Sequence, residues 1–214
     1  MIPTNPLVVD LYHGDRVTDF AALKAAGVAG VIHKAHQGAS PQGNDPVYGL
    51  RRRAANHAGL LWGAYHFMTD DDPAAQAEAF LASATPDADT LLAIDFEPYG
   101  RRTPSLGQLR TLLHAIVARA GRKAVIYSGS LLKETLAASP DDFLGSHRLW
   151  LAQYVQEWTL APMTAWERPW LWQFTGDGQG PEPHKLPGAA GSGGFVDINR
   201  FEGTIEQLTA GWAS

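Results

Sequence analysis

Residues 91–100 read LLAIDFEPYG, an apolar run that ends in two carboxylates, Asp95 and Glu97. The apolar half is typical of a strand buried on both faces. Successive side chains on a strand point to opposite faces, so Asp95 and Glu97 share one face and Phe96 takes the other. A lone charge in an apolar site is costly. The stretch therefore predicts either an acidic site at the end of a buried strand or a strand that simply runs out into solvent at Pro98.

Around this strand, short apolar runs alternate with Ala-rich segments of helical period, a pattern that indicates βαβ repetition. The predicted strands are residues 7–11, 30–35, 60–67, 90–95, 123–128, 148–154, 169–175 and 194–201. The predicted helices are residues 19–27, 46–59, a segment from 73, 105–120 and 131–138. The last three strands have no convincing helix between them.

This order of elements predicts an α/β fold, an irregular TIM-like (β/α) barrel of about eight strands and five helices, its last three strands lacking helices. A doubly wound open sheet is the alternative. It is disfavoured because no G-x-G-x-x-G follows the first strand, and the GSGG at residues 191–194 has no helix after it.

The composition describes one globular domain over residues 1–214, with 45% hydrophobic and 18% charged residues. No apolar run approaches the roughly 20 residues that cross a bilayer, so we expect no membrane insertion. A net charge of -5 argues against a nucleic-acid partner. The absence of cysteine excludes disulfides and thiolate metal sites. We expect a monomer.

Acidic residues fall where a barrel carries its chemistry, at the ends of its strands. Asp10 lies near the end of the first strand, Asp95 and Glu97 end the fourth, and Asp197 lies in the last. The first and last strands of a closed barrel are neighbours, so Asp10 and Asp197 should lie side by side and face the other pair. Four carboxylates that need no cation or cofactor suit glycoside hydrolysis, in which one acid protonates the leaving oxygen and an anion stabilises the oxocarbenium-like centre.

Four aromatic residues lie in or beside the same strand ends, where flat rings can line a sugar groove: Tyr65, Tyr127, Tyr154 and Trp172. Taken singly, each of them is also an ordinary core residue.

Histidines near the strand ends raise a metal-hydrolase alternative, with Asp10, His13, His33 and His36 as possible ligands. Their spacing is poor, because His33 and His36 are three residues apart and would point to opposite faces of a strand. No His-x-His or His-Glu-x-x-His occurs. We therefore expect no metal, and predict that these histidines form hydrogen bonds around the barrel mouth.

A series of short motifs runs nearly the whole length of the chain: VVDLYHG, HQG followed by ND, AGLLWGAYHF, QAEAF, AIDFE, LWLAQY, LWQFTGDG and VDINRF. No single motif is specific, but in this order they resemble the glycoside hydrolase family 25 lysozymes, the Chalaropsis-type muramidases. The resemblance implies a barrel with five helices and three trailing strands. It also implies hydrolysis of the β-1,4 bond from N-acetylmuramic acid to N-acetylglucosamine in bacterial peptidoglycan.

Carried over by position, the resemblance makes Glu97 the general acid and Asp95 its partner, with Asp10 and Asp197 as supporting carboxylates. A general acid must hold a proton, so we expect Asp95, other acidic neighbours and partial burial to raise the pKa of Glu97. Substrate assistance, in which the acetamido group of the sugar is the nucleophile and Asp95 orients it, is a hypothesis. Tyr12 departs from the family pattern, which has Ser there, and this change could alter substrate fit.

Other functions stay open: a glycan-binding barrel with weak or no turnover, a glucosaminidase, or an amidase acting on the same polymer. The substrate lies outside the cytoplasm, whereas the opening residues MIPTNPLVVDLYHG carry no basic leader and only a short apolar run. We therefore expect delivery without a Sec signal, by phage lysis or by a signal-independent secretion route.

Overall fold

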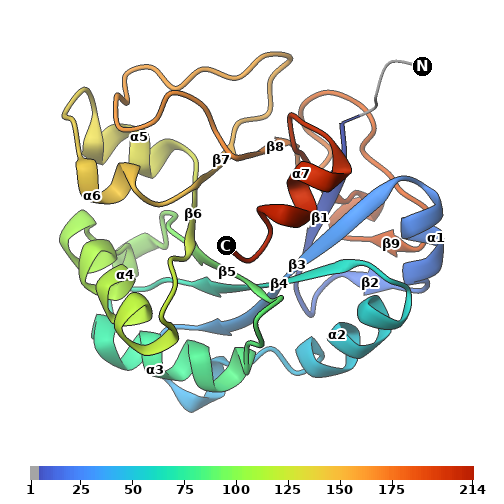
Figure 1. The fold of residues 1–214 in the computed structure, drawn as a ribbon, viewed down its shortest axis with the longest axis horizontal. Helices are drawn as coiled ribbons and strands as arrows, with labels where there is room; N and C mark the ends of the chain where they lie inside the picture. The colour runs from blue at the N-terminus through green and yellow to red at the C-terminus, as the bar shows by residue number, and fades with distance from the viewer. Residues whose placement is uncertain (1–4) are drawn as a thin grey trace.

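Eight strands close into a barrel in the computed structural model, which describes residues 5–214 (Figure 1). Around the barrel the strands follow the order β1, β10, β8, β7, β6, β5, β4, β3. Their bounds are β1 Leu7–Leu11, β3 Val28–Gln37, β4 Leu61–Phe67, β5 Leu91–Asp95, β6 Val125–Ser128, β7 Leu149–Ala152, β8 Leu171–Thr175 and β10 Asp197–Arg200. The α/β barrel predicted from the sequence is confirmed.

The helices lie around most of the barrel, while loops cover the side formed by β7 and β8 (Figure 1). Their bounds are α1 Phe20–Ala25, α2 Tyr48–His57, α3 Pro73–Ala84, α4 Leu106–Ala120, α5 Ser130–Leu136, α6 Asp142–Gly145 and α7 Ile205–Ala210. The short α6 and α7 were not expected. As predicted, no α-helix joins β7 to β8 or β8 to β10. None of the helices described is long and apolar enough to cross a membrane.

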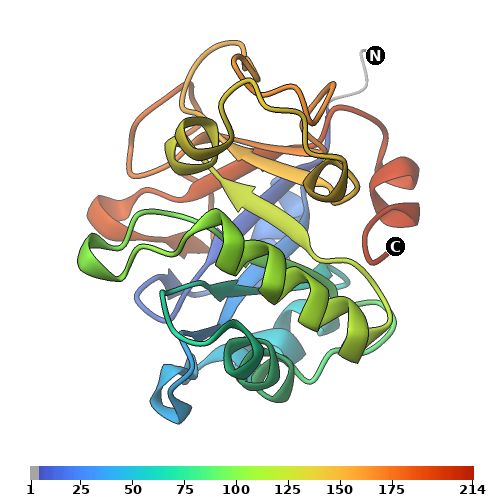
Figure 2. The same ribbon diagram turned by 90° about the vertical axis from the view of Figure 1, so that its left-hand side faces the viewer.

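Helix α4 shows how local sequence sets these elements (Figure 2). The Ser105 side chain accepts from the backbone N–H of Gln108, and the Gln108 side chain accepts from the backbone N–H of Ser105. Together these two bonds form a capping box. Gly121 ends the helix at φ 69, a left-handed conformation that glycine adopts at little cost. Between these signals, the fully buried Leu109 and Leu112 recur at helical spacing and pack toward the core.

The smaller pieces complete the mouth of the barrel. Strands β2 (Arg16–Val17) and β9 (Ala189–Ala190) form a separate two-stranded sheet, and the 3-10 turns are η1 Pro41–Gly43, η2 Gly100–Arg102 and η3 Ser192–Gly194.

The direction of the last strand corrects the parallel barrel expected from the sequence. Strand β10 is antiparallel to both of its neighbours, β1 and β8. The long connection from β8 allows this reversal, since a parallel return would require a crossover. Consequently it is the start of β10, at Asp197, that meets the carboxyl ends of the other strands.

Side chains of the barrel strands form two layers. The inner layer is Val8, Ile32, Leu91, Ala93, Val125, Tyr127, Trp150 and Leu171. The alternate residues point outward and pack beneath the helices. One end of the inner layer is closed by Trp212, which follows α7 and donates from Nε1 to the carbonyl of Trp62 at 2.8 Å. A Cβ at Gly30 would lie 2.8 Å from this indole, so only glycine fits there.

Candidate active site

The acidic end of β5 is built by the alternation of its residues. Leu91 and Ala93 belong to the inner layer, whereas Phe96 belongs to the outer one. Asp95 and Glu97 therefore continue the inner face, as their spacing predicts. The side chain of Asp95 is buried, at 6% exposure, whereas Glu97 is half-buried just beyond the strand. The strand thus does not simply run out into solvent.

Asp10 and Asp197 are direct partners in the register of β1 and β10. Two amides hold Asp10: Nε2 of Gln173 and Nδ2 of Asn199 donate to Oδ2 of Asp10 at 2.9 and 2.8 Å. The backbone N–H of Asp177 donates to Oδ1 of Asp197 at 3.1 Å. The first and last strands therefore bring these two acids side by side, as expected.

Gln173 joins the acids to the aromatic residues. Its Oε1 accepts from the hydroxyls of Tyr127 and Tyr154 at 2.8 and 3.0 Å, while its Nε2 donates to Asp10. Both lone-pair directions of the amide oxygen are thus used by donors. This pattern fixes the orientation of the amide, so the group that faces Asp10 is always a donor.

One carboxylate oxygen of Asp95 is left without a protein partner. Oδ1 of Asp95 is buried and has no hydrogen bond to any residue that the structure describes. An unsatisfied buried polar atom is costly, so it calls for an explanation by function or by protonation. The Lys34 ammonium favours the ionised form of Asp95, and its Nζ donates to Oε1 of Gln37 at 2.5 Å.

All four carboxyl groups have raised pKa values. Burial is the largest cause for each, and it raises the pKa of Asp197 to about 6. Asp197 further raises the pKa of Asp10, although the two amides oppose that rise. Glu97 further raises the pKa of Asp95, and the Lys34 ammonium opposes it. Each of these carboxyl groups therefore keeps its proton to higher pH than it would in water.

Burial and other acidic neighbours raise the pKa of Glu97 as expected, but Asp95 does not contribute as expected. After burial, it is Asp197 and Asp177 that raise the pKa of Glu97, and Asp95 is not among the causes. Within the β5 pair, the Glu97 carboxylate raises the pKa of Asp95, the more deeply buried member.

Three of the four aromatic residues lie with the acids. Besides Tyr127 and Tyr154, Tyr65 lies half-buried against the inner layer, and Asp95 and Asp10 add to the effect of burial in raising its pKa. The prediction that Trp172 lines the groove is wrong. It points to the outer layer, is only 3% exposed, and donates from Nε1 to the carbonyl of Gln153 at 2.8 Å. The alternation of β8 turns Gln173, not Trp172, toward the acids.

The histidines do not gather around the mouth as expected. His33 stacks on Trp62 in the outer layer, and its ring contacts the carbonyl of Lys34 at 2.8 Å and the Arg51 guanidinium at 3.0 Å. His36 stacks on His66 at 5.6 Å, and neither nitrogen of His36 has a hydrogen-bond partner within residues 5–214.

The metal-hydrolase alternative therefore lacks a ligand set. His13 contacts Asp45 at 3.1 Å, whereas Asp10 is held by its two amides. No group of three or more His, Cys, Asp or Glu side chains in the described part of the chain could hold a metal ion.

Two cavities open beside the acids. A small one of about 50 Å³ is lined by Asp10, Asp197 and Tyr12, whose side chain is 40% exposed at the rim. A larger one of about 310 Å³ extends over the ends of β3 and β4, past Lys34 and Tyr99. Asp10 and Asp197 line the small cavity, whereas none of the four carboxyl groups lines the larger one.

Sequence reasoning missed two amides at the centre of this site, Gln173 and Asn199. Both could have been found from strand alternation. Asn199 lies two residues after Asp197 and therefore on the same face, and Gln173 alternates with the outward Trp172 and Phe174. A neutral amide in a sequence indicates a catalytic site less strongly than a carboxylate does.

The fold and site together define a (β/α) barrel with a carboxylate cluster at the mouth. The sequence model of the family described as Glycosyl hydrolases family 25 matches residues 9–182. The chain therefore belongs to glycosyl hydrolase family 25, as the resemblance of its motifs indicated.

Individual relatives agree with this assignment. The chain is 29% identical over 168 residues to the Escherichia coli protein YegX, a match that covers 77% of this chain and 56% of YegX. It is 27% identical to lysozyme M1 of Streptomyces globisporus, over 94% of this chain and 69% of that protein. The chain thus matches little more than half the length of YegX. The crystal structure of the bacterial lysozyme from Streptomyces coelicolor has the same fold, with a TM-score of 0.81, 24% identity and 98% of each chain covered.

Proposed function

We propose that this chain is a muramidase, a lysozyme that hydrolyses the β-1,4 bond from N-acetylmuramic acid to N-acetylglucosamine in peptidoglycan glycan strands. The observation that carries the proposal is the convergence of Asp10, Asp95, Glu97 and Asp197 on the inner face at one end of the barrel. Neighbouring acids with raised pKa values are the groups that a glycosidase uses. Family membership and the lysozyme named among its relatives support the same conclusion.

Glu97 is the general acid in this proposal. It is half-buried, so its carboxyl group can reach the glycosidic oxygen, and its raised pKa keeps the proton in place at working pH. As Glu97 gives its proton to that oxygen, the bond between the oxygen and the anomeric carbon breaks.

Asp95 orients the acetamido group of the sugar that carries this anomeric carbon. Its buried, unpartnered Oδ1 is suited to accept the acetamido N–H, and the acetamido oxygen then bonds to the anomeric carbon. Water later attacks that carbon, the bond from the acetamido oxygen to the carbon breaks, and the water gives a proton to Glu97. This substrate-assisted route gives net retention of configuration. Asp10 and Asp197 support the cationic transition state electrostatically.

We expect the barrel over residues 1–214 to act as one catalytic unit on the cell wall outside the cytoplasm, as a monomer and without a cofactor. Rings of Tyr65, Tyr127 and Tyr154 would contact the glycan.

The test is to digest purified peptidoglycan with the chain in the presence of a chelator, reduce the new ends with borohydride and identify the reduced sugar. Reduced N-acetylmuramic acid is expected. Reduced N-acetylglucosamine would indicate a glucosaminidase, and free peptide stems an amidase. Binding of the polymer with no new ends would indicate a glycan-binding barrel, and activity restored only by added zinc would indicate a metal hydrolase.

A further inference from the structure

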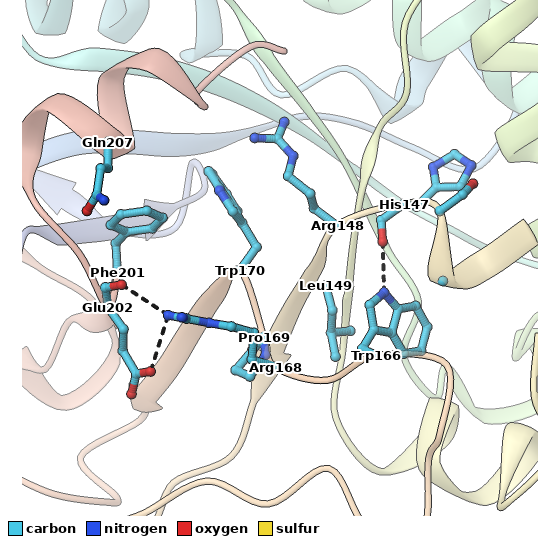
Figure 3. Close-up of a pocket in the computed structure, with 12 residues that line it drawn as sticks. His147, Arg148, Leu149, Trp166, Arg168, Pro169, Trp170, Phe201, Glu202 and Gln207 are labelled. Carbon is cyan, nitrogen blue, oxygen red and sulfur yellow. Dashed lines mark hydrogen bonds and ion pairs between the residues drawn. The ribbon is translucent and has the colours of Figure 1, made fainter. Parts of the chain in front are cut away.

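Another cavity, of about 420 Å³, lies at the end of the barrel away from the carboxylates (Figure 3). Its lining includes Leu149 at the start of β7, Trp170 just before β8, and Phe201 just after the antiparallel β10. All three positions mark the end opposite the mouth. No part of the proposed hydrolytic reaction uses this cavity.

Two indole rings line it, and both are held in place. Trp166 donates from Nε1 to the carbonyl of His147 at 2.8 Å. Trp170 packs under the guanidinium of Arg148, 4.3 Å from the ring centroid, and edge-on against Phe201 at 5.9 Å. Both indoles are half-buried, so each still presents part of its surface to the cavity. Fixed, flat apolar surfaces of this kind bind ligands at low entropic cost.

The hydrogen-bond donors of both arginines at the cavity are already occupied. The Arg148 guanidinium donates to the backbone carbonyls of Gly211, Trp212 and Ser214. Arg168 donates to the carbonyl of Glu202 at 3.1 Å and lies 3.6 Å from its carboxylate (Figure 3). Cations that are satisfied in this way do not favour an anion. The ligand that fits is therefore neutral.

The rim is polar. Gln207 is exposed, and its Oε1 caps α7 by accepting from the backbone N–H of Thr204 at 2.8 Å. Its amide nitrogen has no partner in the described part of the chain, so it can donate to a ligand hydroxyl or carbonyl. The Glu202 carboxylate and the Ser146 hydroxyl lie at the same rim. Apolar faces inside polar edges match a sugar ring, which has C–H faces and hydroxyl edges.

We propose that this cavity is a non-catalytic binding site for a neutral N-acetyl sugar unit of a glycan strand. The choice of this ligand rests on the proposed function, since peptidoglycan repeats such units along one polymer. Binding the polymer at two ends of the barrel raises its effective concentration at the mouth without any change in the chemistry.

The test measures binding in a Glu97→Gln background, in which the polymer is not degraded. Variants are sedimented with insoluble peptidoglycan, and tryptophan fluorescence is titrated with an N-acetylglucosamine trimer. Trp170→Ala and Trp166→Ala are each expected to weaken polymer binding about tenfold, since each removes a fixed aromatic ring face from the cavity. Leu50→Ala, which removes an exposed apolar side chain on α2, is the matched control and should bind as the parent does.

A second variant guards against misfolding. Ser146 is exposed at the rim, so Ser146→Trp should obstruct the cavity without removing a core contact. It should lose polymer binding, keep the parent melting temperature and, with Glu97 intact, keep its rate on short soluble fragments. Undiminished binding in both Trp170→Ala and Ser146→Trp would overturn the proposal. So would a loss confined to Trp170→Ala and accompanied by lower stability. A chain that binds here but hydrolyses nothing would refute the proposed function alone.

Discussion

Gln173 carries no charge, yet its amide opposes the burial that raises the pKa of Asp10. Two tyrosine hydroxyls occupy its amide oxygen, so its N–H must face Asp10, and Asn199 supplies a second N–H to the same carboxylate oxygen. Hydrogen bonds donated to a carboxylate favour its ionised form. These bonds counteract the burial that otherwise raises the pKa of Asp10.

Replacing Gln173 with methionine removes this donor at similar volume. The pKa of Asp10 should then rise further, so the acid limb of the plot of kcat/KM against pH should move to higher pH, and kcat should fall about tenfold or more because the anion stabilises the cationic transition state. The pH profile and thermal unfolding of Gln173→Met are measured beside wild type. A folded variant with an unmoved acid limb would show that the amide only fills space.

A second prediction concerns the neighbour that sets the pKa of Glu97. Because Asp197 raises that pKa, Asp197→Asn should lower it and move the alkaline limb of the pH profile to lower pH, with a reduced rate. Asp95→Asn should lower the rate but leave the alkaline limb in place. If Asp95→Asn alone moved the alkaline limb, the neighbour that raises the pKa of Glu97 would be Asp95 and not Asp197.

At the scale of elements, the sequence predicts the strands and their faces well, because alternation and apolar runs are local signals. It does not predict the reversal of β10, since nothing in residues 176–196 specifies direction before the sheet exists. The misplacement of Trp172 has a similar origin: a bulky aromatic at a strand end suits a groove and a core equally. Consecutive residues on a strand point to opposite faces, so placing Gln173 beside the acids would have placed Trp172 in the outer layer. The short α7 was missed although it has local signals, a capping box formed by Thr204 and Gln207 and a glycine at its end, Gly211.

The closure of the inner layer by Trp212 can be tested at Gly30, in β3. Gly30→Ala would bring a Cβ 2.8 Å from the Trp212 indole and 3.1 Å from the Cβ of Leu61. Overpacking of this kind typically costs 1 to 3 kcal/mol, so the free energy of unfolding in urea should fall by about that much. The pH dependence of kcat/KM should be unchanged, since the carboxylates lie at the other end. Full stability in Gly30→Ala would mean that Trp212 moves aside freely.

At the scale of the whole molecule, buried acids and buried histidines change the stability of the fold with pH in opposite directions. Burial raises the pKa of Asp197 to about 6, so its folded form prefers the proton, and Asp197 costs stability as pH rises from about 4 to 6. Burial lowers the pKa of His66 to about 3, and its neighbours His36 and Lys34 lower it further while Gln76 and Asp71 oppose them. The folded state therefore needs His66 neutral and loses stability as pH falls below about 6.5.

The two effects can be separated by melting temperature. The gain in melting temperature of Asp197→Asn over wild type should be larger at pH 7 than at pH 4. The difference between His66→Phe and wild type should instead become more favourable at pH 4 than at pH 7. Differences that do not vary with pH would mean that neither group titrates across folding in this range.

The central claim is that the Glu97 carboxyl group supplies the proton for cleavage at N-acetylmuramic acid. The most direct measurement is the initial rate at which borohydride-reducible N-acetylmuramic acid ends form from peptidoglycan, for wild type and Glu97→Gln. General acid catalysis is typically worth 10² to 10⁴-fold, so Glu97→Gln should be slower by at least about a hundredfold. Its melting temperature near neutral pH should be equal or higher, since the penalty for ionising a buried acid is gone. A Glu97→Gln rate within a few fold of wild type would contradict the account.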